Sequence, residues 1–405
     1  MLSNEDNELL VRVGADKPMG KMLRRYWIPA CLSEEVAEID GTPKRVKLLG
    51  EDLLAFRDSN GRVGLIGERC PHRSASLVFG RNEECGIRCL YHGWKIDING
   101  NLTDVPTEPP GSKVQEKIKA TAYPTVEKGD IVWTYMGPAD QMPPFPDFEF
   151  THMDQKHRAI AKIVSNVNWV QAMEGSLDSS HSGILHSSYR GQRPSLDNAP
   201  VIETEDTAYG FRYCAIRKPI EAPDKMKYAR ITLFAAPFHC FVPPNGARRT
   251  QHMFVPLDDE RTALYWVDYS TEMEVETEKT RKFLFAEVGV DVDENYNKFR
   301  TLENFFLQDR AAMKAGTSFS GIDGVPNQDM AMQESMGAIV DRTQENLGMS
   351  DIAIIKVRRV MLNAVRSFMN GDAPIGIKTP YPYRELHSEG KVIPIEEPWQ
   401  NLTQL

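Results

Sequence analysis

The stretch Cys70–Trp94, CPHRSASLVFGRNEECGIRCLYHGW, carries the pattern that decides the fold of this chain. It contains two short pairs of potential metal ligands, Cys70-x-His72 and Cys89-x2-His92, and strand-like sequence flanks each pair. Four such side chains on two hairpin tips indicate a metal site. A zinc finger usually takes its cysteines from one loop and its histidines from a helix, and this spacing does neither.

Interleaved cysteines and histidines favour a dinuclear cluster. In a Rieske [2Fe–2S] centre, Cys thiolates bind one iron and His imidazoles bind the other, which raises the reduction potential. A zinc ribbon and a Cys70–Cys89 disulfide are the alternatives. The chain has 6 cysteines, too few and too unevenly spaced for a disulfide framework. Cys85 lies outside the ligand spacing and is expected to be a bystander thiol.

The composition indicates a folded protein without a broad basic surface. The 405 residues are 41% hydrophobic and 26% charged, and the net charge is −9. These values argue against binding to nucleic acid or to an anionic membrane. No apolar run approaches the length of a membrane span, and the first residues are acidic rather than basic, unlike a signal peptide. We therefore expect a cytoplasmic protein.

The sequence pattern changes after the helix-like segment at the N-terminus. Short alternating runs between about 45 and 135 predict a small antiparallel β module, and a Pro-rich stretch at 137–146 marks its end. Further strand-like alternation follows at 208–240 and 252–267. Helical spacing predicts four later helices, over 274–289, 293–315, 327–346 and 350–369.

These patterns predict an α+β chain. We expect a helical segment over 1–25, an all-β Rieske domain over 26–140 and an α+β catalytic domain over 141–405. In the last domain, helices would flank an antiparallel sheet in a helix-grip-like arrangement.

A second constellation, Asp178-x2-His181-x4-His186, lies where a helical pattern gives way to Ser/Gly-rich sequence. A helix end followed by a turn can bring both imidazoles onto one metal. Two histidines and one carboxylate form the facial triad of non-haem Fe(II) oxygenases, which leaves coordination positions open for O2. The alternative is that both histidines are structural.

The two motifs together resemble those of the Rieske non-haem iron aromatic-ring oxygenases. The matching segments are CPHR (70–73), CLYHGW (89–94) and NWVQAMEGSLDSSHSGILH (168–186). The resemblance implies that Cys70, His72, Cys89 and His92 hold the [2Fe–2S] cluster and that His181 and His186 hold a mononuclear iron. It also implies that Asp178 bridges the iron site to His92 of a neighbouring subunit in the assembly.

The carboxylate ligand of the iron must come from far along the chain. In the family that the chain resembles, it lies in an acidic context on a late helix, and Gln328-Asp329-Met330 is the best match. We therefore assign Asp329. Glu334, Asp323 and Asp341 compete with it, although each is more simply interpreted as a helix cap or a solvated acid.

The sequence of residues 80–94 and 327–351 is most similar to that of the phthalate dioxygenase branch of the family. This similarity implies an oxygenase (alpha) subunit in a homotrimer or stacked hexamer, which uses O2 to cis-dihydroxylate an aromatic carboxylate: phthalate, an isomer or a substituted benzoate. Electrons would come from NAD(P)H through a separate flavin and [2Fe–2S] reductase, since the chain has no GxGxxG fingerprint of its own.

An aromatic acid needs positive partners in this acidic protein, and arginine binds carboxylates in bidentate fashion. Arg212 and Arg249, in the strand region of the second domain, are our candidates.

Three alternative functions stay open at this point. A Rieske monooxygenase or O-demethylase, acting on an aromatic ether or acid, would share both metal motifs. A Rieske electron carrier would lack the second iron site. A zinc-stabilised binding module would hold neither iron site.

Overall fold

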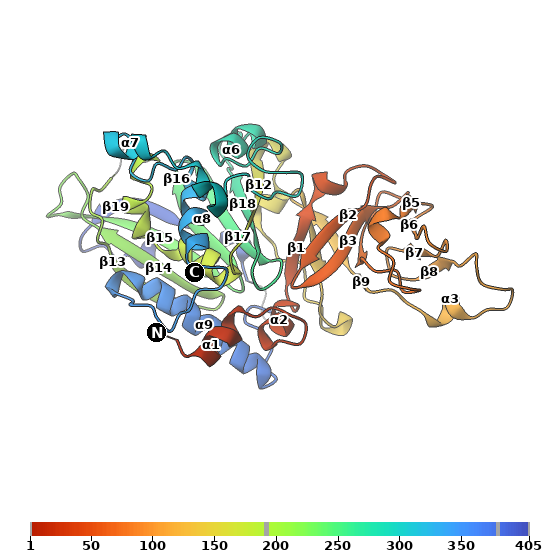
Figure 1. The fold of residues 1–405 in the computed structure, drawn as a ribbon. Helices are drawn as coiled ribbons and strands as arrows, with labels where there is room; N and C mark the ends of the chain where they lie inside the picture. The colour runs from red at the N-terminus through yellow and green to blue at the C-terminus, as the bar shows by residue number, and fades with distance from the viewer. Residues whose placement is uncertain (1, 190–193, 378–380, 404–405) are drawn as a thin grey trace. The chain divides into compact units, whose positions relative to one another are not determined.

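The computed structural model describes residues 2–189, 194–377 and 381–403, and the chain divides into two compact units (Figure 1). The β unit comprises Val13–Asp16 and Gly20–Phe145. The large unit comprises Met1–Arg12, Lys17–Met19 and Pro146–Leu405. Within the described ranges, no helix is both long enough and apolar enough to cross a membrane.

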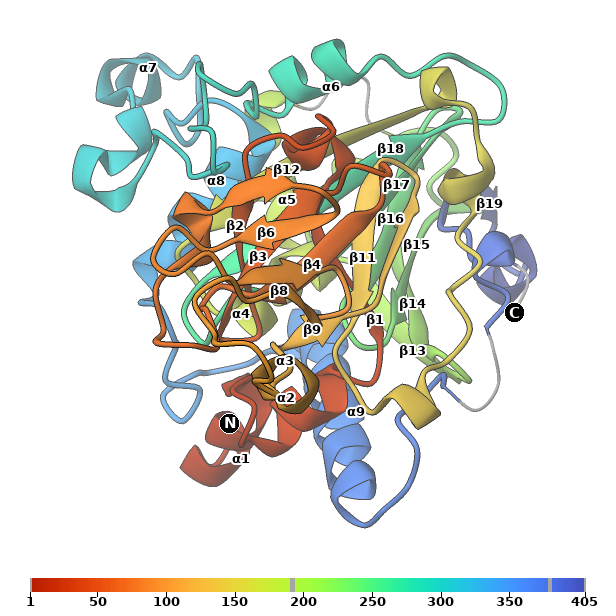
Figure 2. The same cartoon turned by 90° about the vertical axis from the view of Figure 1, so that its right-hand side faces the viewer.

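The β unit consists of three small antiparallel sheets, and most of their strands are labelled in Figure 2. In sheet order, their strands are β1 (Trp27–Leu32), β11 (Ile131–Tyr135) and β10 (Thr125–Lys128); β2 (Lys44–Leu48), β3 (Glu51–Arg57), β4 (Val63–Gly67) and β9 (Ala122–Tyr123); and β5 (Arg81–Glu83), β6 (Gly86–Arg88), β7 (Lys95–Asp97) and β8 (Leu102–Asp104). Buried apolar side chains, including Phe56, Ile66 and Trp94, form one core in this unit.

The large unit is built on an eight-stranded antiparallel sheet (Figure 1). Its strands follow the order β12 (Arg158–Ser165), β18 (Thr262–Tyr269), β17 (Arg248–Pro256), β16 (His239–Asn245), β15 (Met226–Ala235), β14 (Gly210–Arg217) and β13 (Val201–Thr207), and β19 (Glu389–Pro394) also pairs with β15. The long strand β15 pairs with β19 over its first part and with β16 over its last.

Helices accompany both units. They are α1 (Asn4–Val11), α2 (Pro18–Leu23), α3 (Val114–Lys117), α4 (Trp169–Leu177), α5 (His181–Ile184), α6 (Thr277–Phe283), α7 (Arg310–Ala315), α8 (Val325–Ser335) and α9 (Ile352–Met369). Asn168 caps α4 by accepting a hydrogen bond from the Val170 N–H. The predicted fold class, β sheets followed by an α+β domain with a large antiparallel sheet, is confirmed.

The predicted helix over 293–315 is wrong, because only α7 at its end is α-helical. Asp293 folds the start of this segment into a turn by accepting hydrogen bonds from the backbone N–H groups of Asn295 and Asn297. Residues 305–307 then adopt positive φ angles, which interrupt any helix. The predicted helices over 274–289 and 327–346 are real but shorter, ending at Phe283 and Ser335.

Helices α4 and α8 pack against each other through a small set of polar contacts. The Gln171 side-chain amide donates to the carbonyls of Gln333 and Gly337, at 2.9 and 3.0 Å. Gly175 faces α8 at close range, since a Cβ at this position would lie 2.1 Å from Gln333 Nε2. A side chain at position 175 would therefore require the end of the Gln333 side chain to move.

Buried ion pairs anchor each of these helices to the rest of the large unit. Glu174 on α4 binds the guanidinium groups of Arg342 and Arg358, which are almost fully buried. Glu334 on α8 pairs with buried Lys298 and also accepts a hydrogen bond from Ser165 Oγ at 2.9 Å. Because each charge is removed from water, losing one partner would leave the other uncompensated.

We predict that Lys298→Met lowers the free energy of unfolding of the large unit by about 3 kcal/mol, because it strands the Glu334 carboxylate in the interior. Urea unfolding followed by fluorescence measures this change. Lys279→Met is the matched control, since the Lys279–Glu276 pair is exposed and should contribute little. Equal stability of the two variants would contradict the role of the buried pair.

Candidate functional site

The two Cys/His segments of the β unit form loops of the same construction. In each loop, the cysteine N–H donates to the carbonyl five residues later, Ala75 or Trp94, at 2.8 Å. In each, the cysteine carbonyl accepts from the N–H four residues later, at Ser74 or Gly93. Both of these fourth residues have positive φ, 58° and 74°. The loops are therefore turns with matched backbone hydrogen bonds, although the histidine stands two residues after the cysteine in one and three in the other.

These loops bring the four sequence-predicted cluster residues together. The thiols of Cys70 and Cys89 are buried and free of disulfide bonds, and burial and the Cys89 thiol raise the pKa of Cys70 to about 11. The rings of His72 and His92 are partly exposed, with centroids 4.5 Å apart. Trp94 stacks on His72 at 4.4 Å. The thiols lie inside and the imidazoles lie at the rim.

This arrangement fits a Rieske [2Fe–2S] cluster. The Nδ1 atom of His92 is buried and has no hydrogen-bond partner in the described part of the chain. Two buried thiols beside it, of which Cys70 has a raised pKa, call for a cation that stabilises thiolates. Two sulfur and two imidazole ligands on opposite sides are what the cluster requires.

In the large unit, His181, His186 and Asp329 form the second group of metal-ligating side chains. His181 opens α5, His186 follows it, and Asp329 lies on α8. The Nε2 atoms of the two histidines are 3.1 Å apart, and Asp329 Oδ1 lies 3.4 and 3.0 Å from them. Adjacent ligands of an octahedral ion with bonds of about 2.1 Å are separated by about 3 Å. The three atoms therefore match one face of such an ion.

The electrostatics of this group also favour a cation. Burial opposes a charge on His181, yet the carboxylates of Asp178 and Asp329 raise its pKa to about 10. Burial alone would raise the pKa of Asp329, but hydrogen bonds from His181 and His186 hold it well below its usual range. Carboxylates and imidazoles facing one another in a desolvated place attract positive charge.

The other acids have different partners. Asp178 lies behind His181, with its carboxylate 3.3 Å from His181 Nδ1, and it also accepts from the Ser180 N–H. Glu334 is the partner of Lys298. Asp323 accepts from the Tyr189 hydroxyl, and Asp341 accepts from the Thr343 N–H and hydroxyl. Of the four candidates for the carboxylate ligand, only Asp329 meets both histidines in the described structure.

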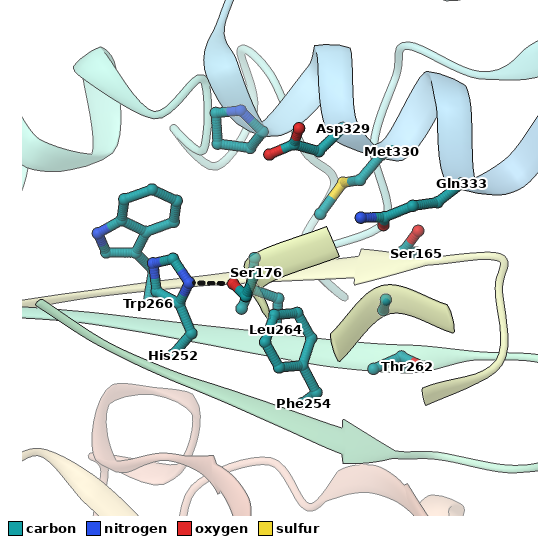
Figure 3. Close-up of a pocket in the computed structure, with 12 residues that line it drawn as sticks. Ser165, Ser176, His252, Phe254, Thr262, Leu264, Trp266, Asp329, Met330 and Gln333 are labelled. Carbon is teal, nitrogen blue, oxygen red and sulfur yellow. Dashed lines mark hydrogen bonds between the residues drawn. The ribbon is translucent and has the colours of Figure 1, made fainter. Parts of the chain in front are cut away.

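A small cavity of about 30 Å³ lies beside Asp329 (Figure 3). Phe254, Leu264, Trp266 and Met330 supply apolar walls. His252 also lines it, with its Nδ1 2.6 Å from Ser176 Oγ, drawn as a dashed line in Figure 3. The space suits one or two water molecules. A larger ligand would therefore require side chains such as the flexible Met330 to move.

The structure gives protein partners to both arginines that the sequence suggested as substrate ligands. Arg212 is buried against Glu205 and the Thr403 carbonyl, at 2.8 and 2.6 Å. Arg249 contacts Glu149 and the His387 ring. Both guanidinium groups are already committed to protein partners, and neither lines the cavity beside Asp329.

A different pair of arginines surrounds Ser179, next to Asp178. Arg217 donates to the Ser179 carbonyl at 2.7 Å, and both Arg217 and Arg230 donate to its hydroxyl, at 3.2 and 3.3 Å. No acidic side chain among the described residues forms an ion pair with either arginine. Burial and the neighbouring Arg230 lower the pKa of Arg217. Every guanidinium nitrogen of Arg217 already donates to Ser179 or to the Asp197 carbonyl, so within the described chain Arg230 is the member of the pair with nitrogens left to bind an anion.

Comparison with known proteins agrees with this geometry. A family model described as Rieske [2Fe-2S] domain matches residues 26–124, and one described as LigXa C-terminal domain like matches residues 134–404. The phthalate 4,5-dioxygenase oxygenase subunit of Pseudomonas putida is 47% identical over 391 residues, covering 93% of this chain and 89% of that protein. The 3-chlorobenzoate-3,4-dioxygenase oxygenase subunit of Comamonas testosteroni is 34% identical over 401 residues, covering 93% and 92%.

A solved structure shares the fold at lower identity. The terminal oxygenase of carbazole 1,9a-dioxygenase from Nocardioides aromaticivorans IC177 superposes with a TM-score of 0.61 at 20% identity, over 89% of this chain and 97% of that one. The chain belongs to the Rieske aromatic-ring-hydroxylating oxygenases, as an oxygenase (alpha) subunit. It is the terminal oxygenase of a Rieske system. Its cofactors are a Rieske [2Fe–2S] cluster and a mononuclear iron.

Two buried histidines of the large unit predict a loss of stability in mild acid. Burial lowers the pKa of His239 and of His252 to about 3. In the unfolded chain each ring would bind a proton below about pH 6.5, whereas the folded chain excludes that proton down to about pH 3. Stability is therefore full above pH 6.5 and falls below it. Between pH 7 and 5.5 we expect a loss of about 2 to 3 kcal/mol.

Urea unfolding at the two pH values measures this loss. His239→Gln should remove about half of the difference between pH 7 and pH 5.5, because one ring no longer titrates on unfolding. An unchanged difference would show that His239 does not contribute.

Proposed function

We propose that this oxygenase cis-dihydroxylates an aromatic carboxylate: phthalate, a phthalate isomer or a substituted benzoate. The observation that carries the proposal is the pair Arg217 and Arg230 around Ser179, which lacks an acidic partner in the described chain and lies two residues from His181. Two adjacent guanidinium groups suit one or two carboxylates. The identity to a phthalate 4,5-dioxygenase oxygenase subunit supports the same substrate class.

We assign the metal ligands as the sequence predicted. Cys70, Cys89, His72 and His92 hold the [2Fe–2S] cluster, and His181, His186 and Asp329 hold the mononuclear iron. The iron supplies O2 activation and the cluster supplies electrons. The protein's own task is to position the ring and to keep the site dry. The apolar walls formed by Phe254, Leu264 and Trp266 serve both purposes.

The partners and setting follow from the same proposal. Electrons come from NAD(P)H through a separate flavin and [2Fe–2S] reductase, and the protein works in the cytoplasm. It assembles as a homotrimer or a stacked hexamer. A head-to-tail ring would bring the imidazole rim of one chain beside the iron site of the next.

We assign Asp178 as the link between these two sites. Its carboxylate holds His181 Nδ1, and backbone N–H groups fix its orientation. In the assembly, it would accept a hydrogen bond from His92 of the neighbouring chain. A carboxylate between two imidazoles orients both rings and can take up a proton when the charge of either site changes.

The test of the function is a single turnover of the purified full-length protein. Protein with about three irons and two sulfides per chain is reduced with dithionite and mixed with O2 and phthalate. A cis-diol product supports the proposal. In a parallel run with an aromatic methyl ether in place of phthalate, a phenol with formaldehyde would favour a monooxygenase or O-demethylase, which shares both metal motifs.

We predict that Arg230→Met weakens phthalate binding about 10- to 100-fold, because it removes a charge-assisted hydrogen bond to a carboxylate. Arg217→Met should act similarly, although its guanidinium is buried and its loss also affects folding. Substrate-dependent O2 uptake gives the apparent affinity, and metal analysis confirms intact sites. Arg359→Met, on the exposed face of α9, is the control. Unchanged affinity in Arg230→Met would exclude this pair as the substrate anchor.

For Asp178→Asn, we predict unchanged iron and sulfide content but at least tenfold slower turnover. Rapid mixing of the reduced protein with O2 and phthalate, followed by the visible absorption of the cluster, measures the rate of cluster re-oxidation. A normal rate would contradict the linking role. Loss of the mononuclear iron would reduce the role of Asp178 to orienting His181.

A further inference from the structure

Gln328 precedes Asp329 on α8, is fully buried, and contacts His186 from the side opposite the metal-facing nitrogen. Its Oε1 lies 2.7 Å from His186 Nδ1. His186 Nε2 points to Asp329 and His181. The other neighbours of the Gln328 side chain therefore determine whether its amide oxygen or its amide nitrogen faces His186.

The orientation of the Gln328 amide follows from its other contacts. Its Nε2 lies 2.8 Å from the Ile322 carbonyl and 2.7 Å from Ser320 Oγ. A carbonyl oxygen only accepts, so the amide nitrogen must face Ile322. A flipped amide would place two acceptors against each other at that position. Gln328 Oε1 is therefore the atom that faces His186, and it can only accept.

An acceptor at Nδ1 requires that this nitrogen of His186 carries the hydrogen. The neutral ring then has its lone pair on Nε2, the atom that meets Asp329 Oδ1 at 3.0 Å. We infer that Gln328 is a positioning residue: it selects the tautomer and the ring orientation in which His186 binds iron. This inference rests on the proposed role of His186 as an iron ligand.

The two histidines consequently have partners of different charge. Asp178, a carboxylate, faces His181 Nδ1, whereas an amide faces His186 Nδ1. Gln328 thus orients its ring without adding a further negative charge to a site that already contains Asp178 and Asp329. Partners of this kind, bound to the far nitrogen of a ligating histidine, typically contribute 10- to 100-fold in metal affinity.

The test uses the full-length protein with its cluster intact and Co²⁺ as the probe of the mononuclear site. Gln328→Met keeps the volume but removes the acceptor, and we expect Co²⁺ to bind 10- to 100-fold more weakly by calorimetry. Asn327→Leu is the matched control, since the side chain of this neighbouring buried amide donates to the Asp323 carbonyl and has no hydrogen bond to either histidine among the described residues. This variant should bind Co²⁺ like the parent.

Proton NMR of the Co²⁺ form supplies a second measurement. The parent should show two hyperfine-shifted, solvent-exchangeable imidazole N–H signals, one from each histidine. In Gln328→Met, the His186 signal should exchange much faster or disappear, while the His181 signal remains. A merely structural role for Gln328 would leave both signals in place.

The outcomes separate this inference from the proposed ligand set. Parent-like affinity and two N–H signals in Gln328→Met, with binding abolished in His186→Ala, would overturn the positioning role alone. Parent-like binding in His186→Ala would overturn the assignment of His186 as a ligand.

Discussion

The contact on which the rest of the large unit depends is that of the Asp329 carboxylate with the imidazoles of His181 and His186. These groups come from segments more than 140 residues apart, and they must meet within a few tenths of an ångström to share one ion. His181 and His186 follow α4 in the chain, and Asp329 lies on α8. The distance between these two helices must therefore be fixed. The charges that fix it are buried with their partners, so that neither helix can shift without exposing an uncompensated ion.

Much of the fold could be predicted from local pattern. The matched loops at Cys70 and Cys89 depend on residues within five positions, and short-range spacing predicts such turns. Helix α9 is long and strongly amphipathic, so its limits were predicted within two residues. The region 293–315 was different, because side-chain caps at Asp293 and Asp309 and left-handed residues at 305–307 outweigh its helical spacing. Hydrophobic periodicity does not show where side-chain caps and left-handed residues compete with helix formation.

The residues of the candidate site also differ in how well the local sequence pattern predicts them. His181 and His186 lie in one short motif, and Asp329 was found by its resemblance to a late acidic helix. The arginine pair that we propose as the anion site could not be predicted. Arg212 and Arg217 lie on the same strand β14 an odd number of residues apart and so face opposite sides of the sheet. No sequence signal indicated which side carries Ser179. Gln328 stood beside Asp329 in the sequence, but its role depends on Ile322 and Ser320, which only the fold brings to it.

The division of the chain between units bears on the order in which it can fold during synthesis. The β unit is nearly continuous, so it can close once about 145 residues have been made. The large unit, in contrast, includes α1: the Val11 carbonyl accepts from Asn168, and Asn7 donates to the Val340 carbonyl. At roughly 5–20 residues per second, the ribosome needs some tens of seconds to make that distant partner. During this interval α1 lacks part of the surface against which it packs in the folded protein. A nascent chain stalled before residue 340 would carry a finished electron-transfer module and an unfinished enzyme.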